Sequence, residues 1–217
     1  IKPGETVAFV GPSGSGKSTI VSLILRANAP QSGTIYVDDL PIDTVAIESW
    51  RRRIGTVSQQ TMLWDGSVRE NILFGSDRDL TQEDLDAVVR HSRIDEFRDR
   101  LGKDGLDTLI GENGVQLSGG QCQRIAIARV LAGDPKVIVF DEATSALDYK
   151  TEKDVYVAMQ NALHGRTGII IAHRLGTVKK ANRIIVLDKG KVVGEGTYDE
   201  LSANNEFFKT LIGSEIK

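Results

Sequence analysis

The chain has 217 residues, of which 40% are hydrophobic and 26% are charged, and its formal net charge is −3 at pH 7. This composition suits a large globular domain. The negative net charge gives no sign of the basic surface that binds nucleic acids or anionic membranes. No apolar run approaches the roughly 18 residues of a membrane-crossing helix. The single cysteine, Cys122, excludes an internal disulfide, and the N-terminus has no signal-peptide pattern, so we expect a soluble chain in a reducing cytosol.

Strand and helix patterns alternate along the chain. Strand patterns occupy residues 5–10, 33–37, 54–58, 136–140, 167–172, 183–187 and 191–195. Helical patterns lie between several of them, which favours an α/β fold with a largely parallel sheet and helices on its faces. Capping-box patterns begin at Ser67 and Thr81, and residues 102–114 suggest a long loop. We therefore expect a helical insertion over 63–133 within a sheet core of 1–62 and 134–217.

A glycine-rich motif follows the first strand pattern. It reads Gly11-Pro12-Ser13-Gly14-Ser15-Gly16-Lys17-Ser18, and Thr19 comes next in the helical pattern behind it. Glycines at this spacing let backbone N–H groups converge on phosphates, and the helix start adds the positive end of its dipole. We expect Lys17 to contact the β- and γ-phosphates of a triphosphate and Ser18 to bind Mg²⁺. The alternative is a flexible turn with a solvated lysine, which does not require this spacing.

The strand pattern at 136–140 ends in two carboxylates, Asp141 and Glu142. Because neighbouring strand side chains point to opposite faces, we expect the two acids to have different roles. Asp141 is placed to bind the Mg²⁺ shell, and Glu142 can accept a proton from a water lined up on the γ-phosphate. The alternative is a pair of solvated acids, or a cap for the next helix.

Two more polar residues follow strand patterns. His173 comes directly after the apolar run 169–172, at the end where open α/β sheets bind ligands, so it could hold the γ-phosphate and the water in register. Gln59 offers a neutral amide to the metal or the water, although most such glutamines are solvated. His91 and His164 lack this setting, and we expect them at the surface.

A second motif, Leu117-Ser118-Gly119-Gly120-Gln121, would by itself be an ordinary helix cap. With the other motifs in this order, the chain resembles the ATP-binding cassette (ABC) family, in particular the nucleotide-binding domains of ABC exporters, over nearly its whole length. The resemblance identifies Ser118-Gly119-Gly120-Gln121 as the signature, Gln59 as the Q-loop, Asp141-Glu142 as the Walker B pair, Ser145-Ala146-Leu147-Asp148 as the D-loop and His173 as the switch histidine. It implies a P-loop NTPase core with an antiparallel β portion and an inserted helical subdomain.

The resemblance also implies cofactors and partners. ATP and Mg²⁺ are the expected cofactors, and the signature together with Asp148 is expected to complete the ATP site of a second, head-to-tail domain. Ser118 at a helix start suits this role, because its hydroxyl and the neighbouring amides form an anion site. Segments 65–72 and 108–114, which includes Glu112, resemble exporter loops that meet transmembrane coupling helices. We therefore expect an ATPase that powers export from the cytoplasmic face of a membrane.

Two other functions are open at this stage. One is a soluble ABC ATPase that acts on DNA or ribosomes, which the acidic balance disfavours. The other is a binding module in which nucleotide only holds a dimer together, and Glu142 and His173 argue against it.

The chain departs from the family pattern at a few positions. Cys122 stands where a basic residue usually follows the signature glutamine, and Trp64 replaces a common Phe. A thiol near a helix start can have a lowered pKa, but a passive packing role fits Cys122 better than a redox switch. The family stacks adenine on an aromatic residue upstream of the phosphate loop, and that position precedes Ile1. We therefore expect the chain to be part of a longer protein and to bind nucleotide weakly on its own.

Overall fold

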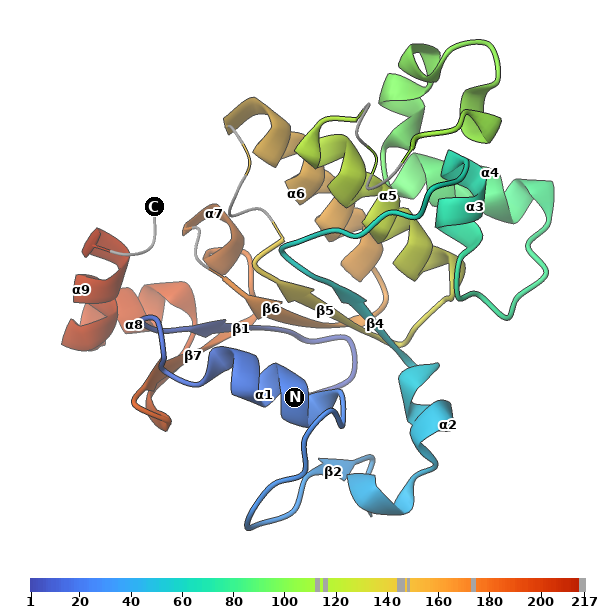
Figure 1. Ribbon diagram of the computed structural model, residues 1–217. Helices are drawn as coiled ribbons and strands as arrows, with labels where there is room; N and C mark the ends of the chain where they lie inside the picture. The colour runs from blue at the N-terminus through green and yellow to red at the C-terminus, as the bar shows by residue number, and fades with distance from the viewer. Residues whose placement is uncertain (112–113, 115–116, 144–146, 148, 173–174, 215–217) are drawn as a thin grey trace.

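A six-stranded sheet with the order β4-β5-β6-β1-β7-β8 forms the centre of the computed structural model (Figure 1). The structure describes residues 1–111, 114, 117–143, 147, 149–172 and 175–214. The strands are β1 (Thr6–Val10), β2 (Tyr36–Val37), β3 (Leu40–Pro41), β4 (Ile54–Val57), β5 (Val137–Asp141), β6 (Thr167–Ile171), β7 (Arg183–Asp188) and β8 (Lys191–Gly196).

Helices cover both faces of this sheet. The α-helices are α1 (Lys17–Ile24), α2 (Ile47–Arg51), α3 (Val68–Leu73), α4 (Gln82–His91), α5 (Gly119–Ala132), α6 (Tyr149–Leu163), α7 (Leu175–Val178), α8 (Tyr198–Asn204) and α9 (Glu206–Ser214). Short 3₁₀ helices are η1 (Ile42–Thr44), η2 (Ile94–Leu101) and η3 (Gly105–Asp107). Among the described residues, none of the helices combines the length and apolar character needed to cross a membrane.

The sheet is mostly parallel. Strands β4, β5, β6, β1 and β7 all run in one direction, and β8 returns antiparallel to β7. The carboxyl ends of the five parallel strands therefore meet at one edge of the sheet. The α/β fold with a largely parallel sheet and an antiparallel portion is confirmed.

The strand expected over 33–37 is shorter in the structure. Only Tyr36–Val37 pairs, with Leu40–Pro41, in a separate two-stranded antiparallel hairpin. Asp38 and Asp39 connect the two strands with φ of 47° and 66°, the left-handed geometry of a tight hairpin turn. The chain reverses so early that the pairing spans two residues on each side.

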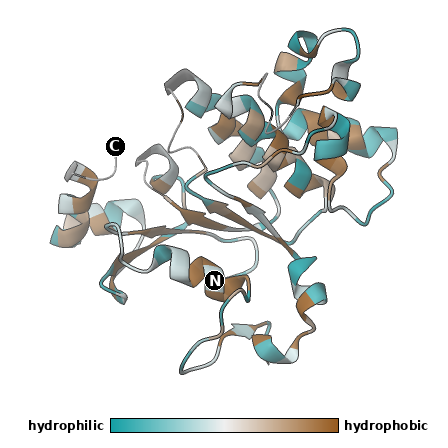
Figure 2. Ribbon diagram, in the orientation of Figure 1, coloured by the Kyte–Doolittle hydropathy of each residue, from teal (hydrophilic) through white to brown (hydrophobic). Residues whose placement is uncertain are grey.

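Side chains on alternate strand positions divide the core into two layers. In β1, Ala8 and Val10 belong to the cluster that contains residues of α5 and α6, whereas Val7 and Phe9 belong to the cluster that contains Val21 of α1. Figure 1 shows the corresponding arrangement, with α1 on one face of the sheet and α5 and α6 on the other. In Figure 2 the central strands are mainly brown, as expected for strands buried on both faces.

Local capping sets the start of several helices. The capping boxes expected at Ser67 and Thr81 are both formed, and they begin α3 and α4. At Ser67 the backbone N–H donates to the Glu70 carboxylate at 2.7 Å, and the Glu70 N–H donates to the Ser67 hydroxyl at 3.1 Å. A capping box at Thr197, which the sequence analysis did not identify, begins α8.

We predict that Phe140→Ala lowers the free energy of unfolding by about 3–5 kcal/mol, because Phe140 is 0% exposed between β5 and the α5–α6 layer. Phe207→Ala is the matched control, since Phe207 on α9 is 37% exposed, and it should cost under about 1 kcal/mol. Urea denaturation of both variants measures the difference. Equal losses would contradict the assignment of Phe140 to the centre of the core.

Candidate functional site

The motifs expected to act together lie along the carboxyl edge of the parallel strands. The glycine-rich loop follows β1, Ser58 and Gln59 follow β4, and Asp141 ends β5. Ligands bind at this edge in open α/β sheets because the loops there are close together and lie outside the hydrogen-bonded ladder.

The loop after β1 is tightly enclosed at its start. A Cβ on Gly11 would lie 2.2 Å from the Leu187 carbonyl oxygen and 2.7 Å from the Ser15 hydroxyl, so the position requires glycine. Gly14 and Gly16 have φ of 78° and 107°, in the left-handed region that favours glycine. Further along, the Gly190 N–H donates to the Ser15 carbonyl at 3.0 Å, so the turn between β7 and β8 supports the loop.

The loop curls around the ammonium group of Lys17. The buried Lys17 Nζ donates to the carbonyl oxygens of Gly11 at 2.7 Å and Pro12 at 3.0 Å. These contacts hold the positive charge of the Lys17 side chain inside the loop, next to any group that the loop encloses.

The loop and the first turn of α1 fit a phosphate group. The first turn of α1 contains no acidic residue, so nothing there opposes the positive end of the helix dipole. Ser18 and Thr19 are exposed on this turn, as are Ser13 and Gly14 in the loop. The Ser15 hydroxyl is buried and has no hydrogen-bond partner among the described residues, so a polar group remains for an incoming oxygen.

Asp141 is the last residue of β5, whereas Glu142 lies just beyond the strand. Asp141 pairs with Ile171 in the sheet, whereas Glu142 has φ of 52° and its N–H donates to the Ile171 carbonyl at 3.2 Å. The strand therefore ends between the two acids, and a left-handed backbone step, not strand alternation, separates their side chains. The Ser18 hydroxyl, the Gln59 amide and the Asp141 carboxylate all offer oxygen atoms, the donors that Mg²⁺ prefers.

The side chain of Gln59 is exposed, and its backbone carbonyl accepts a hydrogen bond from helix α5. Its carbonyl accepts a hydrogen bond from Gln123 Nε2 of α5 at 2.9 Å, and the Ser58 carbonyl accepts from the same nitrogen at 3.2 Å. Gln123 is a site residue that the sequence motifs do not single out. The available signal is a glutamine two positions before the apolar run Ile125-Ala126-Ile127-Ala128.

The signature residues form the start of α5. The Ser118 hydroxyl accepts from the Gln121 N–H at 3.3 Å, and Gln121 Oε1 accepts from the Ser118 N–H at 2.8 Å, which completes a capping box. A Cβ on Gly120 would lie 1.9 Å from Thr151 of α6, so glycine allows the two helices to pack closely. Ser118 and Gly119 remain exposed.

Cys122 is half-buried one turn into α5, and burial raises the pKa of its thiol. The rise in pKa caused by desolvation therefore exceeds the lowering expected near a helix start. A passive packing role fits Cys122 better than a reactive thiolate.

Helices α1 and α5, which both begin at glycine-rich motifs, start near the same edge of the sheet. α1 begins after the carboxyl end of β1, and α5 ends just before the amino end of β5, so both helices begin near the carboxyl edge. They lie on opposite faces of the sheet (Figure 1).

Several expected site residues lie outside the described residues. These are Glu112, Ser145, Ala146, Asp148 and His173. His91 and His164 are exposed, as expected.

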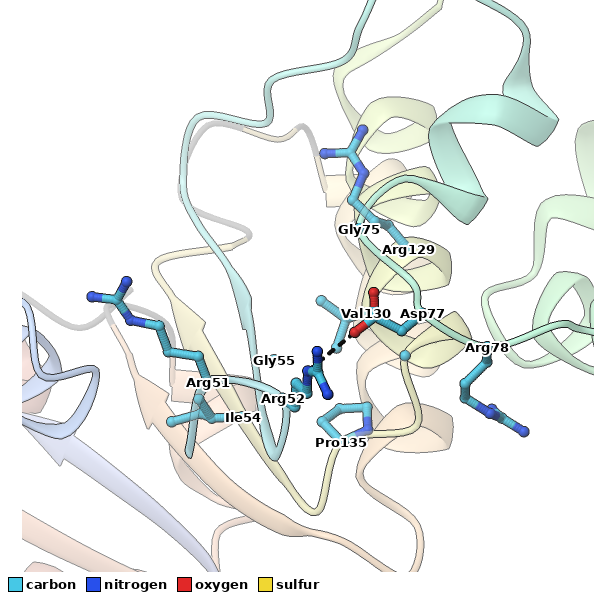
Figure 3. Close-up of a pocket in the computed structure, with 11 residues that line it drawn as sticks. Arg51, Arg52, Ile54, Gly55, Gly75, Asp77, Arg78, Arg129, Val130 and Pro135 are labelled. Atoms are coloured by element: carbon cyan, nitrogen blue, oxygen red, sulfur yellow. Dashed lines mark ion pairs between the residues drawn. The ribbon is translucent and has the colours of Figure 1, made fainter. Parts of the chain in front are cut away.

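A cavity of about 330 Å³ lies at the opposite end of β4 (Figure 3). Ile54, Gly55, Val130 and Pro135 provide apolar lining, and an ion pair of 3.1 Å between Arg52 and Asp77 lies beside them. Because β4 begins at Ile54, this cavity is separated from the carboxyl edge by the length of the strand.

We predict that Gly11→Ala lowers the free energy of unfolding by about 1–3 kcal/mol, since the added methyl group has no space beside the Leu187 carbonyl. Gly133→Ala is the control, because Gly133 has φ of −76° and its Cβ would make an ordinary 3.5 Å contact. Urea denaturation compares the two. A Gly11→Ala variant as stable as the control would show that the loop is not enclosed as described.

Known proteins show the same fold and sequence pattern. The family model described as "ABC transporter" matches residues 1–145. An ATP-dependent lipid A-core flippase of Alkalilimnicola ehrlichii is 46% identical, over 97% of this chain and 36% of the flippase. A multidrug resistance ABC transporter ATP-binding and permease protein of Lactococcus lactis is 41% identical, over 99% of this chain and 36% of that protein.

A solved structure, that of a bacterial Atm1-family ABC exporter with ATP bound, superposes with a TM-score of 0.88 at 40% identity. The superposition covers 97% of this chain and 37% of the exporter chain, so this chain spans just over a third of the length of these relatives. The family match extends over the phosphate loop, the signature and the paired acids. The chain belongs to the ABC transporter family.

Proposed function

We propose that this chain is the nucleotide-binding domain of an ABC exporter, in which it binds ATP with Mg²⁺ and hydrolyses ATP to ADP and phosphate to drive export. The observation that carries the proposal is the glycine loop closed around the Lys17 ammonium, at the same sheet edge as Asp141 and Glu142. The relatives named above, exporters and flippases by their descriptions, support the transport role.

Each residue at the edge has a proposed task. Lys17 and the loop amides hold the β- and γ-phosphates, since a cation and converging N–H groups replace the water that ATP loses. Ser18, Asp141 and Gln59 would hold Mg²⁺, which neutralises negative charge on the phosphate oxygens. Glu142 accepts the proton of the attacking water, and His173 orients that water and the γ-phosphate.

The site is completed by a second domain in this proposal. Because α1 and α5 begin near the same edge on opposite faces, a head-to-tail partner facing that edge can bring its own signature and D-loop, which correspond to Ser118–Gln121 and Asp148 here, to the ATP held by this chain. The same geometry places this chain's signature at the partner's phosphate loop. We further propose a division into an ATP-binding core (1–62 and 134–217) and a helical part (63–133).

An exposed apolar patch suits contact with transmembrane coupling helices at the cytoplasmic face of a membrane. The patch consists of Met62, Trp64 and Phe74, which are 72%, 56% and 51% exposed. The Trp64 and Phe74 rings lie 4.8 Å apart, and the Arg129 guanidinium lies 5.6 Å from the Phe74 ring. Large apolar groups gathered at a surface mark interaction sites. The net charge of −3 disfavours the alternative of a soluble ABC ATPase acting on DNA or ribosomes, because nucleic acid attracts basic surfaces.

In a chain extended to include the segment upstream of Ile1, we predict that Glu142→Gln lowers the rate of ATP hydrolysis about 10²–10⁴-fold, because glutamine keeps the size of the side chain but cannot accept the proton. ATP affinity should persist, since Lys17, Ser18 and Asp141 are unchanged. The ATP-bound dimer should accumulate, and light scattering should find a dimer with ATP and Mg²⁺ and a monomer with ADP. Phosphate release measures the rate.

Lys17→Ala is the matched comparison for this prediction. It removes the cation from the loop, so nucleotide binding and ATP-dependent dimerisation should both be lost. A Glu142→Gln variant that hydrolyses ATP at the parent rate, or a Lys17→Ala variant that binds ATP normally, would overturn the proposed site.

We predict that hydroxyl-radical oxidation of Met62 and Trp64 is strong in this isolated chain and weak in the full-length transporter, because coupling helices cover the patch. Met159 and Trp50 are internal controls, since they are buried and should react weakly in both samples. Phe207 is the exposed control and should react equally in both. Mass spectrometry measures the oxidation, and equal labelling of Met62 in the two samples would exclude docking at this patch.

A further inference from the structure

The chain segment that follows β4 is attached to α5. After Val57 the backbone leaves the sheet, and Gln123 Nε2 donates to the carbonyls of both Ser58 and Gln59, at 3.2 and 2.9 Å. Gln123 lies five positions after Ser118, which caps the same helix. One side chain thus joins the loop that carries a proposed Mg²⁺ ligand to the helix that begins with the signature.

The orientation of the Gln123 amide follows from its partners. Its NH₂ group has two hydrogens, and two backbone carbonyls face it, so the flipped amide would set three oxygens against one another. The side chain is 5% exposed. Its Oε1 atom is buried without a hydrogen-bond partner among the described residues, a free-energy cost that a residue with only a packing role would not carry. We therefore attribute the presence of a glutamine at this position to the two hydrogen bonds that it donates.

A second attachment lies further along the same helix. Arg129 donates from one terminal nitrogen to the Met62 carbonyl at 2.9 Å and from Nε to the Asn71 carbonyl at 2.8 Å. In Figure 3 the Arg129 guanidinium points away from the Arg52–Asp77 ion pair. Residues 58–62 are thus bound to α5 at both ends, by Gln123 and by Arg129.

The phosphate loop has separate supports. Lys17 donates to Gly11 and Pro12 within the loop, and Gly190 donates to Ser15 from the β7–β8 turn. Among the residues that the structure describes, no hydrogen bond connects Gln123 to that loop. Loss of the Gln123 bonds should therefore change the position of Gln59 and leave the phosphate loop in place.

We propose that Gln123 is a positioning residue that fixes the Gln59 loop to the signature helix, so that the metal-side amide and Ser118 move as one unit. The inference rests on the proposed function, because it assigns a consequence to Gln59 as a Mg²⁺ ligand. A displacement of Gln59 toward bound metal is transmitted through these two hydrogen bonds to α5 and from there to its capped first turn. The partner's nucleotide would then meet a signature whose position depends on the metal bound in this chain.

The test compares Gln123→Met with Gln82→Met. Methionine has a similar length and no donor, and Gln82 is an exposed glutamine on α4, so the control makes the same chemical change elsewhere. Without nucleotide, amide hydrogen exchange over residues 58–62 should be at least about fivefold faster in Gln123→Met than in the parent chain, because the segment loses one of its two attachments to α5 and opens more often. Exchange in α1 and in Gln82→Met should match the parent.

Titration with a fluorescent ATP analogue supplies the second measurement. In EDTA the affinity of Gln123→Met should equal that of the parent, and the gain in affinity on adding Mg²⁺ should shrink severalfold. In a Gln59→Ala background, Gln123→Met should cause no further loss, since the effect passes through Gln59. Gln123→Asn keeps a polar amide with one methylene less reach, and it should show the same pattern if the methionine variant folds poorly.

Unchanged exchange over residues 58–62 would overturn the attachment itself. An equal loss of affinity in EDTA, or a further loss in the Gln59→Ala background, would show that Gln123 acts by a general structural route. Normal ATP binding by Lys17→Ala would instead contradict the proposed function. The exchange result over residues 58–62 would still test the attachment by Gln123 independently.

Discussion

The position of the Lys17 ammonium group is the constraint on which the rest of the site depends. A cation removed from water requires compensation, and here the carbonyls of Gly11 and Pro12 provide part of it. These carbonyls point at Lys17 only because the loop bends sharply at its glycines. The absence of a side chain at Gly11 also lets the loop lie directly against the Leu187 carbonyl at the end of β7.

The parallel sheet turns this local arrangement into a site. Val7 pairs with Ile169 and Arg183, which puts β1 between β6 and β7, and β5 lies beyond β6. Loops after β1, β5 and β4 therefore open at one edge although more than a hundred residues of sequence separate some of them. The left-handed step at Glu142 ends the strand after Asp141, which is compatible with the proposed division of metal binding and water activation between the two acids.

Helix α5 is the element that links the parts of this edge. Its first turn carries the signature, Gln123 and Arg129 hold the segment after β4, and its far end packs on the sheet. There a Cβ on Gly55 would lie 2.4 Å from Val130, and near the start of the helix Gly120 lets α6 approach. A helix packed this closely at both ends is well placed to transmit a displacement along its length, because interiors are close-packed and transmit strain. This packing is compatible with the proposed dimer, in which a change at one nucleotide affects the signature that meets the other.

The sequence alone determined those features that depend on residues close together in the chain. The strand, glycine loop and helix around Lys17, the capping boxes at Ser67 and Thr81, and the alternation of Val7 and Phe9 with Ala8 and Val10 all follow from local sterics, local hydrogen bonds and side-chain period. The motif order also indicated the family, since its residues stand at the expected places after strands and at helix starts. Tertiary structure alone decided the strand order, the support of Ser15 by Gly190, the attachment of Gln59 to Gln123, and the left-handed backbone of Glu142. Each of these joins groups distant in sequence or depends on the packing around them, and the free energy of such contacts is set by the assembled core, which local patterns do not encode.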